Sequence, residues 1–298
     1  MRILNFGSLN VDKTYKVKQF ARAKETIKAW KYEEFCGGKG LNQSIALAKA
    51  GAAVVHAGCV GQDGKKLIET LAEAGVDTNY IRMNDGSSGH AIIQVDESGQ
   101  NSIIIYGGAN EDITKEYIDE VLNDFGADDM VLLQNEIINV DYVIKRARQK
   151  GLKITFNPSP VSDSLKECEL ESIDYFILNE VEGEWISKVS SSQPEKMIET
   201  LEEKYPQAAF VLTLGEGGSY FFSKEKKVYQ KIYKVPVIDT TGAGDTFTGY
   251  FLSEIVKSGS VENALKYAAA AASISVSRHG AAQSIPDKAE VEKFVGEH

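Results

Sequence analysis

The chain has 298 residues, of which 43% are hydrophobic and 26% are charged, and its formal net charge is −10. This length and composition are typical of one large globular domain. The negative charge and the lack of a long basic tract argue against a nucleic acid as a partner.

The cysteines and the first residues indicate the compartment. Cys36, Cys59 and Cys168 are far apart and show no pairing pattern, which is typical of a protein in a reducing cytosol. The segment after Phe6 is too polar for a signal peptide, and no apolar run approaches the length of a membrane span. We therefore expect a cytoplasmic protein without membrane contact.

Short β-rich runs alternate with amphipathic helical runs along most of the chain. The expected strands lie at 2–7, 53–61, 130–135, 153–158, 175–179 and 209–215, and the expected helices at 40–52, 65–75, 140–151 and 194–205. Such alternation predicts a mostly parallel sheet between two helical layers, a three-layer α/β/α fold.

Two stretches depart from this alternation. Residues 25–35 alternate polar and apolar side chains like a half-exposed strand, and residues 89–108 are typical of two strands joined by a turn. They could pair as a small antiparallel sheet that serves as a lid or a dimer contact, or they could be edge hairpins without a role. We expect one domain, residues 1–298, with the lid at about 12–36 and 88–107.

The run DTTGAGDTFTG, residues 239–249, places a glycine-rich turn before an amphipathic helix. The backbone N–H groups of Gly242, Ala243, Gly244 and Asp245 could form an anion hole at the helix N-terminus. Asp245 could then accept the proton of a substrate hydroxyl. The helix dipole favours its ionised form, so we expect it to orient the hydroxyl first and take the proton late. Alternatively, the tetrad is only a helix cap.

Two further stretches carry groups that suit sugar hydroxyls. Asn10 and Asp12 follow the first strand at a spacing that puts both side chains on one face of a continuing strand. Gly38 and Lys39 precede a helix whose first turn holds Asn42. The alternatives are an Asx turn for the first stretch and a tight strand-to-helix turn for the second.

Two later stretches suit a nucleotide. Asn179 and Glu182 are one helical turn apart and could place Mg²⁺ on phosphates through water, or they could form a solvated acidic helix start. Residues 213–218, TLGEGG, follow a strand and could lie along the phosphates or ribose of a nucleotide. No histidine spacing predicts a metal site.

Together these stretches resemble the PfkB, or ribokinase-like, family of sugar kinases. Residues 37–42, followed by Gly51 and Gly61, resemble the N-terminal family signature, and residues 239–245 resemble the C-terminal one. The stretches at 157–160, 179–182 and 213–218 follow in the family's order. The resemblance covers nearly the whole chain.

The resemblance implies a role for individual residues. The residues implied to hold the sugar hydroxyls are Asn10, Asp12, Gly38, Lys39, Asn42, Glu136 and Asp245. Those implied to contact ATP are Asn179, Thr213, Gly215, Gly218 and Gly244, with Asn179 and Glu182 also organising Mg²⁺. A potassium loop, built largely from backbone carbonyls, is implied at Asp239, Thr241, Ser275, Arg278, Gly280 and Ser284.

The resemblance also implies an activity and an assembly. The expected reaction is transfer of the γ-phosphoryl group of ATP to a primary hydroxyl, with Mg²⁺ as cofactor and K⁺ as activator. D-ribose, giving ribose 5-phosphate, is the expected substrate, and a fructokinase, a nucleoside kinase or a sugar-binding sensor without catalysis are the alternatives. The lid implies a homodimer.

Overall fold

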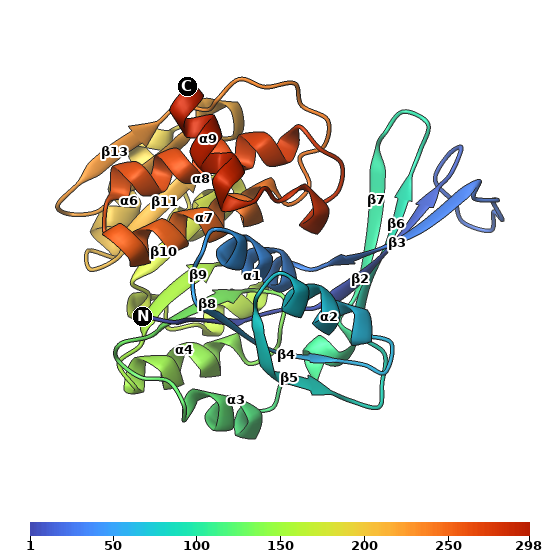
Figure 1. Ribbon diagram of the computed structural model, residues 1–298, viewed down its shortest axis with the longest axis horizontal. Coiled ribbons are helices and arrows are strands. Elements are labelled where there is room, and N and C mark those ends of the chain that lie inside the picture. The colour runs from blue at the N-terminus through green and yellow to red at the C-terminus, as the bar shows by residue number, and fades with distance from the viewer.

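A nine-stranded sheet forms the centre of the computed structural model, which describes residues 1–298 (Figure 1). Its strands, in spatial order, are β13 (Lys227–Gln230), β12 (Ser219–Phe222), β11 (Ala209–Thr213), β10 (Tyr175–Asn179), β9 (Lys153–Asn157), β8 (Met130–Gln134), β1 (Ile3–Phe6), β4 (Val54–Val60) and β5 (Asp77–Met83). All neighbours from β11 to β5 run parallel, and the β12–β13 hairpin adds two antiparallel strands at one edge. The expected three-layer, mostly parallel fold is confirmed.

Helices cover both faces of this sheet. One face carries α1 (Lys39–Lys49), α2 (Lys65–Glu73), α7 (Ala243–Ser258), α8 (Val261–Val276) and α9 (Lys288–Glu297). The other carries α3 (Lys115–Leu122), α4 (Val140–Gln149), α5 (Glu180–Ser187) and α6 (Pro194–Lys204). Every expected strand and helix is present, and no helix has the length and apolar character needed to cross a bilayer.

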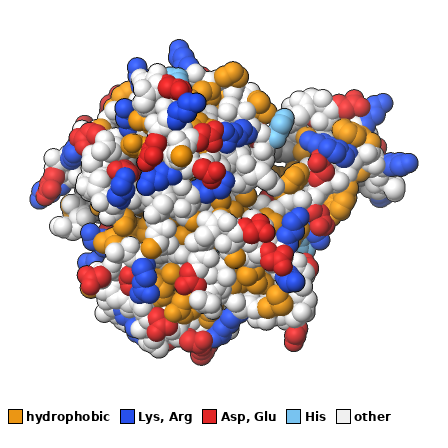
Figure 2. Space-filling view, viewed as in Figure 1, with side chains coloured by type: hydrophobic (Ala, Val, Ile, Leu, Met, Phe, Trp, Pro, Cys, Tyr) orange, Lys and Arg blue, Asp and Glu red, His pale blue; other side chains and the backbone are white.

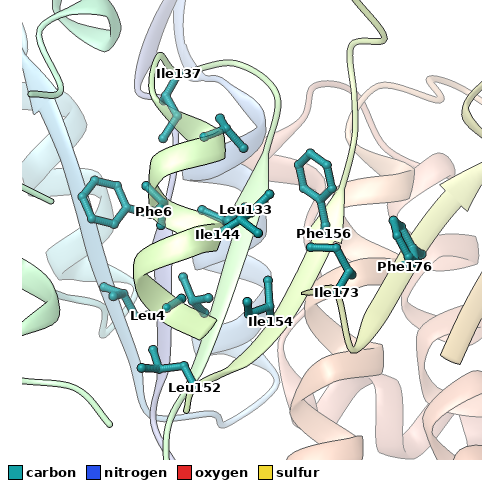
Figure 3. Close-up of a cluster of buried hydrophobic side chains, with 14 of the residues drawn as sticks. Leu4, Phe6, Leu133, Ile137, Ile144, Leu152, Ile154, Phe156, Ile173 and Phe176 are labelled. Carbon is teal, nitrogen blue, oxygen red and sulfur yellow. The ribbon is translucent and has the colours of Figure 1, made fainter. Parts of the chain in front are cut away.

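Side chains of the strands alternate between two hydrophobic cores of 34 and 33 buried residues. In β1, Leu4 and Phe6 point toward α3 and α4 and pack near Leu133 and Ile154 (Figure 3). Ile3 belongs to the opposite core, beneath α1 and α7. Burial of both faces explains why these strands are almost continuously apolar.

Four buried amide or imidazole side chains interrupt this pattern on one face only. Asn5 in β1, His56 in β4, Gln134 in β8 and Asn157 in β9 are all buried, at 8% exposure or less. Their strand neighbours Leu4, Val55, Leu133 and Phe156 belong to the α3–α4 core. Because successive side chains alternate, the four polar groups point toward α1 and α7.

A second sheet, here called the small sheet, projects from the body of the molecule (Figure 1). It consists of β3 (Lys31–Gly37), β2 (Asn10–Lys16), β6 (Gly89–Val95) and β7 (Asn101–Tyr106), in that spatial order. The two stretches expected to pair lie in one sheet, but they do not pair with each other. β2 lies between them and pairs with β3 in antiparallel and with β6 in parallel fashion, whereas β6 and β7 form the expected antiparallel hairpin. The strand expected from residue 25 begins only at Lys31.

The small sheet is open to solvent. Every residue of β7 is exposed, including Ile103, Ile104 and Ile105 at 50–61%. Figure 2 shows hydrophobic side chains together with charged ones on this projecting part.

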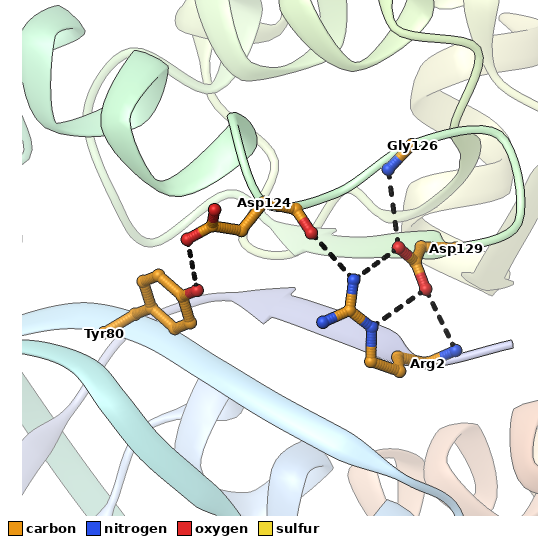
Figure 4. Close-up of polar contacts among 5 residues, drawn as sticks. All are labelled: Arg2, Tyr80, Asp124, Gly126 and Asp129. Atoms are coloured by element: carbon orange, nitrogen blue, oxygen red, sulfur yellow. Dashed lines mark hydrogen bonds and ion pairs between the residues drawn. The ribbon is translucent and has the colours of Figure 1, made fainter.

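The amino ends of the central strands are tied together by an ionic cluster (Figure 4). The Arg2 guanidinium donates to both carboxylate oxygens of Asp129, at 3.1 and 2.8 Å, and to the carbonyl oxygen of Asp124 at 2.8 Å. Tyr80 donates its hydroxyl to the Asp124 carboxylate at 2.6 Å. Ligands bind at the carboxyl ends of the strands in open α/β sheets. This cluster lies at the opposite edge of the sheet, so it stabilises the fold away from the expected ligand site.

Candidate active site

A cavity of about 230 Å³ opens at the carboxyl ends of β9, β10 and β11, beside the N-terminus of α7. In the sheet, β1 lies between β4 and β8, so the strands that follow β1 in the sequence are added first on one side of it and then on the other. Ligands of open α/β sheets bind at the carboxyl ends of the strands beside such a reversal of strand order. The cavity is lined by Lys39, Asn157, Ile177, Leu178, Asn179, Glu182, Thr213, Thr240, Gly242, Gly244, Asp245 and Thr248. Seven of the residues singled out from the sequence are therefore brought together in one place.

The glycine-rich turn gives α7 an open N-terminus at the cavity. Gly242, the residue before the helix, has a left-handed backbone with φ 74°, which favours glycine. A Cβ on Gly244 would meet no atom within 4 Å, so a ligand can approach the backbone there. Free N–H groups at a helix N-terminus attract anions.

Asp245 does not cap the helix. Its buried carboxylate accepts hydrogen bonds from Asn42 Nδ2 at 3.1 Å and from Gln43 Nε2 at 2.9 Å, both on α1. No side chain caps α7. The cap interpretation is therefore wrong, because this carboxylate is held by side chains of a distant helix and faces the cavity.

Close packing of α1 against α7 makes this contact possible. A Cβ on Gly249 would lie only 2.4 Å from the Cβ of Ala46, so glycine is required where the helices meet. Asp245 and Gly249 lie one turn apart on α7, and Asn42 and Ala46 lie one turn apart on α1. The glycine thus lets the amides of α1 reach the carboxylate of α7.

Lys39, at the start of α1, is the one cationic side chain among the residues that line the cavity. The carboxylate of Asp245, and then those of Glu136 and Glu182, raise the pKa of Lys39 above its usual value. No carboxylate lies within ion-pair distance of its ammonium group. The charge is therefore available to an anionic ligand.

Two neighbouring carboxylates, Glu136 and Asp12, retain oxygens without a partner, although neither lines the cavity. Glu136 Oε2 accepts from the Ser8 hydroxyl at 2.5 Å and from the Lys39 backbone at 2.9 Å, and its Oε1 accepts from no protein group. Asp12, on β2, accepts no hydrogen bond from the protein. Burial, and then repulsion by Glu136, raise the pKa of Asp12 to about 7.

Glycines make room for these groups. A Cβ on Gly37 would lie 2.1 Å from a carboxylate oxygen of Asp12, and Gly38 has φ 91°. Asn10 lies on the same face of β2 as Asp12 and accepts from Asn110 Nδ2 at 2.7 Å. The Asn10 amino group has no partner in the protein and remains free to donate.

Asn179 and Glu182 form a reciprocal cap at the start of α5. The Glu182 backbone donates to Asn179 Oδ1 at 3.0 Å, and the Asn179 backbone donates to Glu182 Oε2 at 2.9 Å. Glu182 is only 3% exposed, and burial raises its pKa. The interpretation of a solvated acidic helix start is therefore wrong for Glu182, although it fits the exposed Glu180.

The TLGEGG stretch only partly reaches the cavity. Thr213, the last residue of β11, lines it, whereas Gly215 and Gly218 do not. Both glycines have positive φ values, 52° and 85°, in the turn that leads to β12. These glycines lie in the connection between the end of β11 and the start of β12, next to Thr213 in the chain.

The implied potassium residues come from the loop before α7 and from the end of α8 with the loop that follows it. Asp239 accepts from the Thr241 backbone at 2.9 Å and from the Gly280 backbone at 3.0 Å. Burial acts to raise the pKa of Asp239, but these hydrogen bonds outweigh it and lower the pKa. Ser275 and Ser284 hydrogen-bond to each other at 2.8 Å, and the Arg278 side chain turns away to pair with Glu290.

Sequence reasoning missed two amides that shape the site. Gln43 contacts Asp245, and Asn157 both lines the cavity and donates to Glu182 Oε2 at 3.2 Å. The signal for Asn157 was available, since an amide ending an otherwise apolar strand marks a buried polar contact. For Gln43 no such signal exists, because its partner lies 202 residues away.

Comparisons with known proteins agree with this geometry. Residues 2–288 match the pfkB family carbohydrate kinases. Ribokinase of Haemophilus influenzae is 33% identical over 296 residues, covering 97% of this chain and 96% of the relative. Deoxyribokinase of Salmonella typhi is 31% identical over 301 residues, covering 99% and 97%.

A solved structure of Arabidopsis thaliana ribokinase, complexed with ribose and ATP, superposes with a TM-score of 0.88 at 32% identity. The match covers 99% of this chain and 98% of that one. The chain therefore belongs to the pfkB family of carbohydrate kinases, phosphotransferases that act on an alcohol group.

Proposed function

We propose that the protein transfers the γ-phosphoryl group of ATP to the primary hydroxyl of D-ribose, giving ribose 5-phosphate. The observation that carries this proposal is the pair of neighbouring carboxylates, Asp12 and Glu136, which keep unpartnered oxygens, with Glu136 also bonded to the backbone of Lys39 at the edge of the cavity. Sugar hydroxyls are the donors that such acceptors need. The ribokinase and deoxyribokinase relatives support a pentose.

Asp245 is proposed as the base. The substrate hydroxyl donates to its carboxylate, which Asn42 and Gln43 already hold in place. Phosphoryl transfer passes through a loose transition state, so little proton removal is needed before the new P–O bond begins to form. Asp245 therefore orients the hydroxyl first and accepts its proton as the bond is completed.

The turn at residues 242–244 is proposed to stabilise the transferred group. Gly242 and Gly244 line the cavity beside Asp245, so their backbone N–H groups are proposed to meet the negative charge that develops on the phosphoryl oxygens. The N–H group of Ala243, in contrast, already donates to the carbonyl oxygen of Thr240 at 3.2 Å. Lys39 supplies a positive charge in the same cavity. Asn179, Thr213 and the turn with Gly215 and Gly218 are proposed to lie along ATP.

Magnesium is proposed as the cofactor, organised by Asn179 and Glu182 through water. The fit rests on the buried Glu182 carboxylate, which lines the cavity and accepts hydrogen bonds from the amides of Asn157 and Asn179 without a cationic partner. A single carboxylate suits Mg²⁺, which keeps most of its water and binds mainly to phosphate oxygens. When bound, the ion neutralises charge on the transferred phosphates.

Potassium is proposed as an activator at the loops described above. The Asp239 carboxylate accepts hydrogen bonds from both segments, and the structure holds no group of three or more His, Cys, Asp or Glu side chains that could bind a metal ion. That chemistry fits a monovalent cation held mainly by neutral oxygens, including those of Thr241, Ser275, Gly280 and Ser284 and the Arg278 backbone.

We propose that residues 1–298 form a single catalytic domain, that the small sheet is its lid, and that two lids meet in a homodimer. Ile103 and Ile105 share a face with Asp12, as the strand register requires. Contiguous exposed apolar side chains of this kind mark protein–protein contact surfaces, and the same surface of a second copy would bury them. Light scattering should give the mass of a dimer, and Ile105→Lys should give a monomer. A monomeric wild-type protein would refute the dimer.

A substrate panel tests the ribose assignment. Purified protein with Mg-ATP and K⁺ would be assayed against D-ribose, 2-deoxy-D-ribose, D-fructose and adenosine. Ribose should give the highest kcat/KM, and deoxyribose should be about 10- to 100-fold worse, because loss of one hydroxyl leaves a half-buried carboxylate oxygen unpaired. Equal or better rates with deoxyribose, fructose or adenosine would reassign the substrate.

A further inference from the structure

Four buried amide side chains form a continuous hydrogen-bonded chain that ends on Asp245. Gln134 Nε2 donates to Asn5 Oδ1 at 3.0 Å and to Gln43 Oε1 at 2.7 Å. Gln43 Nε2 in turn donates to Asp245 Oδ1 at 2.9 Å and to Asn157 Oδ1 at 3.1 Å. None of the four is more than 8% exposed.

The contacts at the two ends of this chain determine which amide group donates and which accepts in each hydrogen bond. Asn5 Nδ2 donates to the backbone carbonyl of Gly40 at 2.8 Å. Asn157 Nδ2 donates to the backbone carbonyl of Ile177 at 2.9 Å and to Glu182 Oε2 at 3.2 Å. Carbonyl and carboxylate oxygens can only accept, so Asn5 and Asn157 must turn their own oxygens inward.

This arrangement dictates how Gln43 is oriented. Its amino group must face the oxygens of Asn157 and Asp245, and its oxygen must face Gln134. If Gln134 did not donate, Gln43 Oε1 would be buried without a partner, and only the contacts of its amino group with Asn157 and Asp245 would hold the amide. The loss of that anchor would leave Gln43, and with it the Asp245 carboxylate, less firmly positioned.

Gln134 itself occupies a restricted position. It lies at the end of β8, does not line the cavity, and its Oε1 is buried without any partner. A Cβ on Gly7 would lie 2.6 Å from that oxygen, so the glycine keeps space for it. An unpartnered buried carbonyl is unfavourable, and an aliphatic side chain would suit this apolar strand better. The contribution of Gln134 at this position is therefore the two hydrogen bonds that its amino group donates to Asn5 and Gln43.

We infer that Gln134 is a positioning residue for phosphoryl transfer, which acts through Gln43 to hold the Asp245 carboxylate as an acceptor toward the substrate hydroxyl. The inference rests on the proposed role of Asp245 as the base. Gln134 touches neither the cavity nor Asp245, so it acts only through the amide chain.

The test uses kinetics of the full-length protein with ribose and Mg-ATP. Gln134→Met keeps the volume of the side chain but removes both donors. It should lower kcat by about 10- to 100-fold while leaving the KM values for sugar and ATP within about threefold, since supporting hydrogen bonds typically have effects of that size. Gln134→Glu, with an oxygen in place of the amino group, should also lower kcat and provides a second variant if the first does not fold.

A double variant separates positioning from general damage to the core. If Gln134 acts through Gln43, then Gln43→Met combined with Gln134→Met should be no slower than Gln43→Met alone. Thr155→Val is the matched control, since Thr155 is a buried polar residue on the neighbouring strand β9, outside the amide chain. It should leave kcat within about twofold of wild type, as expected for a site not coupled to the base.

Asp245→Asn in the same assay keeps the two proposals distinguishable. If Asp245→Asn retains wild-type kcat, the base assignment itself is wrong. If Asp245→Asn is inactive while Gln134→Met and Gln134→Glu retain wild-type kcat, only the positioning inference is overturned. Full multiplication of the two factors in the double variant would overturn it as well.

Discussion

The proposed phosphoryl end of the site, at Asp245 and Glu182, and the proposed sugar end, at Asp12 and Glu136, differ in how the protein satisfies their carboxylates. At the phosphoryl end, Asp245 accepts from two amides of α1, and Glu182 is held in a reciprocal cap. At the sugar end, Asp12 has no partner and Glu136 keeps one oxygen free. The phosphoryl end is therefore organised before substrate arrives, whereas the sugar end is completed by the hydroxyls of the substrate.

The largest expected effect tests the organised end. Asp245→Asn removes the proton acceptor, so kcat should fall by about 10²- to 10⁴-fold, the usual contribution of a positioned acid or base. Asp85→Asn, which changes an exposed acid far from the cavity, is the control and should leave kcat unchanged. A kcat near wild type for Asp245→Asn would mean that another group takes the proton.

The next effect tests the open end. Asp12→Asn replaces a charged acceptor by a neutral amide, so KM for ribose should rise by about 10- to 100-fold, the usual range for a lost charge-assisted hydrogen bond. KM for ATP should change little, because Asp12 does not line the cavity that holds the proposed ATP contacts Asn179 and Thr213. Equal increases in both KM values would indicate general damage to the site instead.

The pH dependence of sugar use is expected to be a smaller effect at the same end. The pKa of Asp12 is raised to about 7 by burial and by Glu136, so the carboxyl becomes protonated as pH falls below 7. A protonated carboxyl accepts fewer hydrogen bonds from sugar hydroxyls. Consequently kcat/KM for ribose should fall between pH 8 and pH 6, and Asp12→Asn should reduce this decline. An identical profile in the variant would contradict the account.

The smallest effect is on stability. Because the folded-state pKa of Asp12 exceeds its value of 3.8 in the unfolded chain, its ionisation weakens folding progressively from about pH 4 to pH 7. Asp12→Asn should therefore raise the free energy of unfolding at pH 8 by about 1–3 kcal/mol, and the gain should shrink toward pH 4. Urea unfolding without sugar at both pH values measures this. Equal free energies of unfolding of wild type and Asp12→Asn at pH 8 would show that the ionised Asp12 carboxylate does not destabilise the fold.

Much of the fold could be predicted from the sequence. Apolar strand patterns such as MVLLQ and helical spacing such as that of residues 140–149 depend on local periodicity, and both are confirmed. The small sheet was predicted from two stretches that lack helical spacing. The start of β3 at Lys31 could not be predicted, because residues 25–30 alternate in the same way and only the pairing partner on β2 sets the boundary.

The site was predictable where a motif carries it and unpredictable where packing does. The glycine turn before Asp245 and the pair Asn179–Glu182 are recognisable in the sequence, and the cavity brings them together. The contact between Gln43 and Asp245 depends on how closely α1 packs against α7, and Gly249 controls that distance. Such a dependence on packing leaves no local pattern to recognise.

Calorimetric titration of ribose into Asp245→Asn and Asp12→Asn tests the contrast between the two ends most directly. We expect Asp245→Asn to bind ribose with an affinity close to wild type although it is catalytically impaired, and Asp12→Asn to lose most of its ribose affinity. Ribose binding that is lost in Asp245→Asn and retained in Asp12→Asn would contradict this contrast.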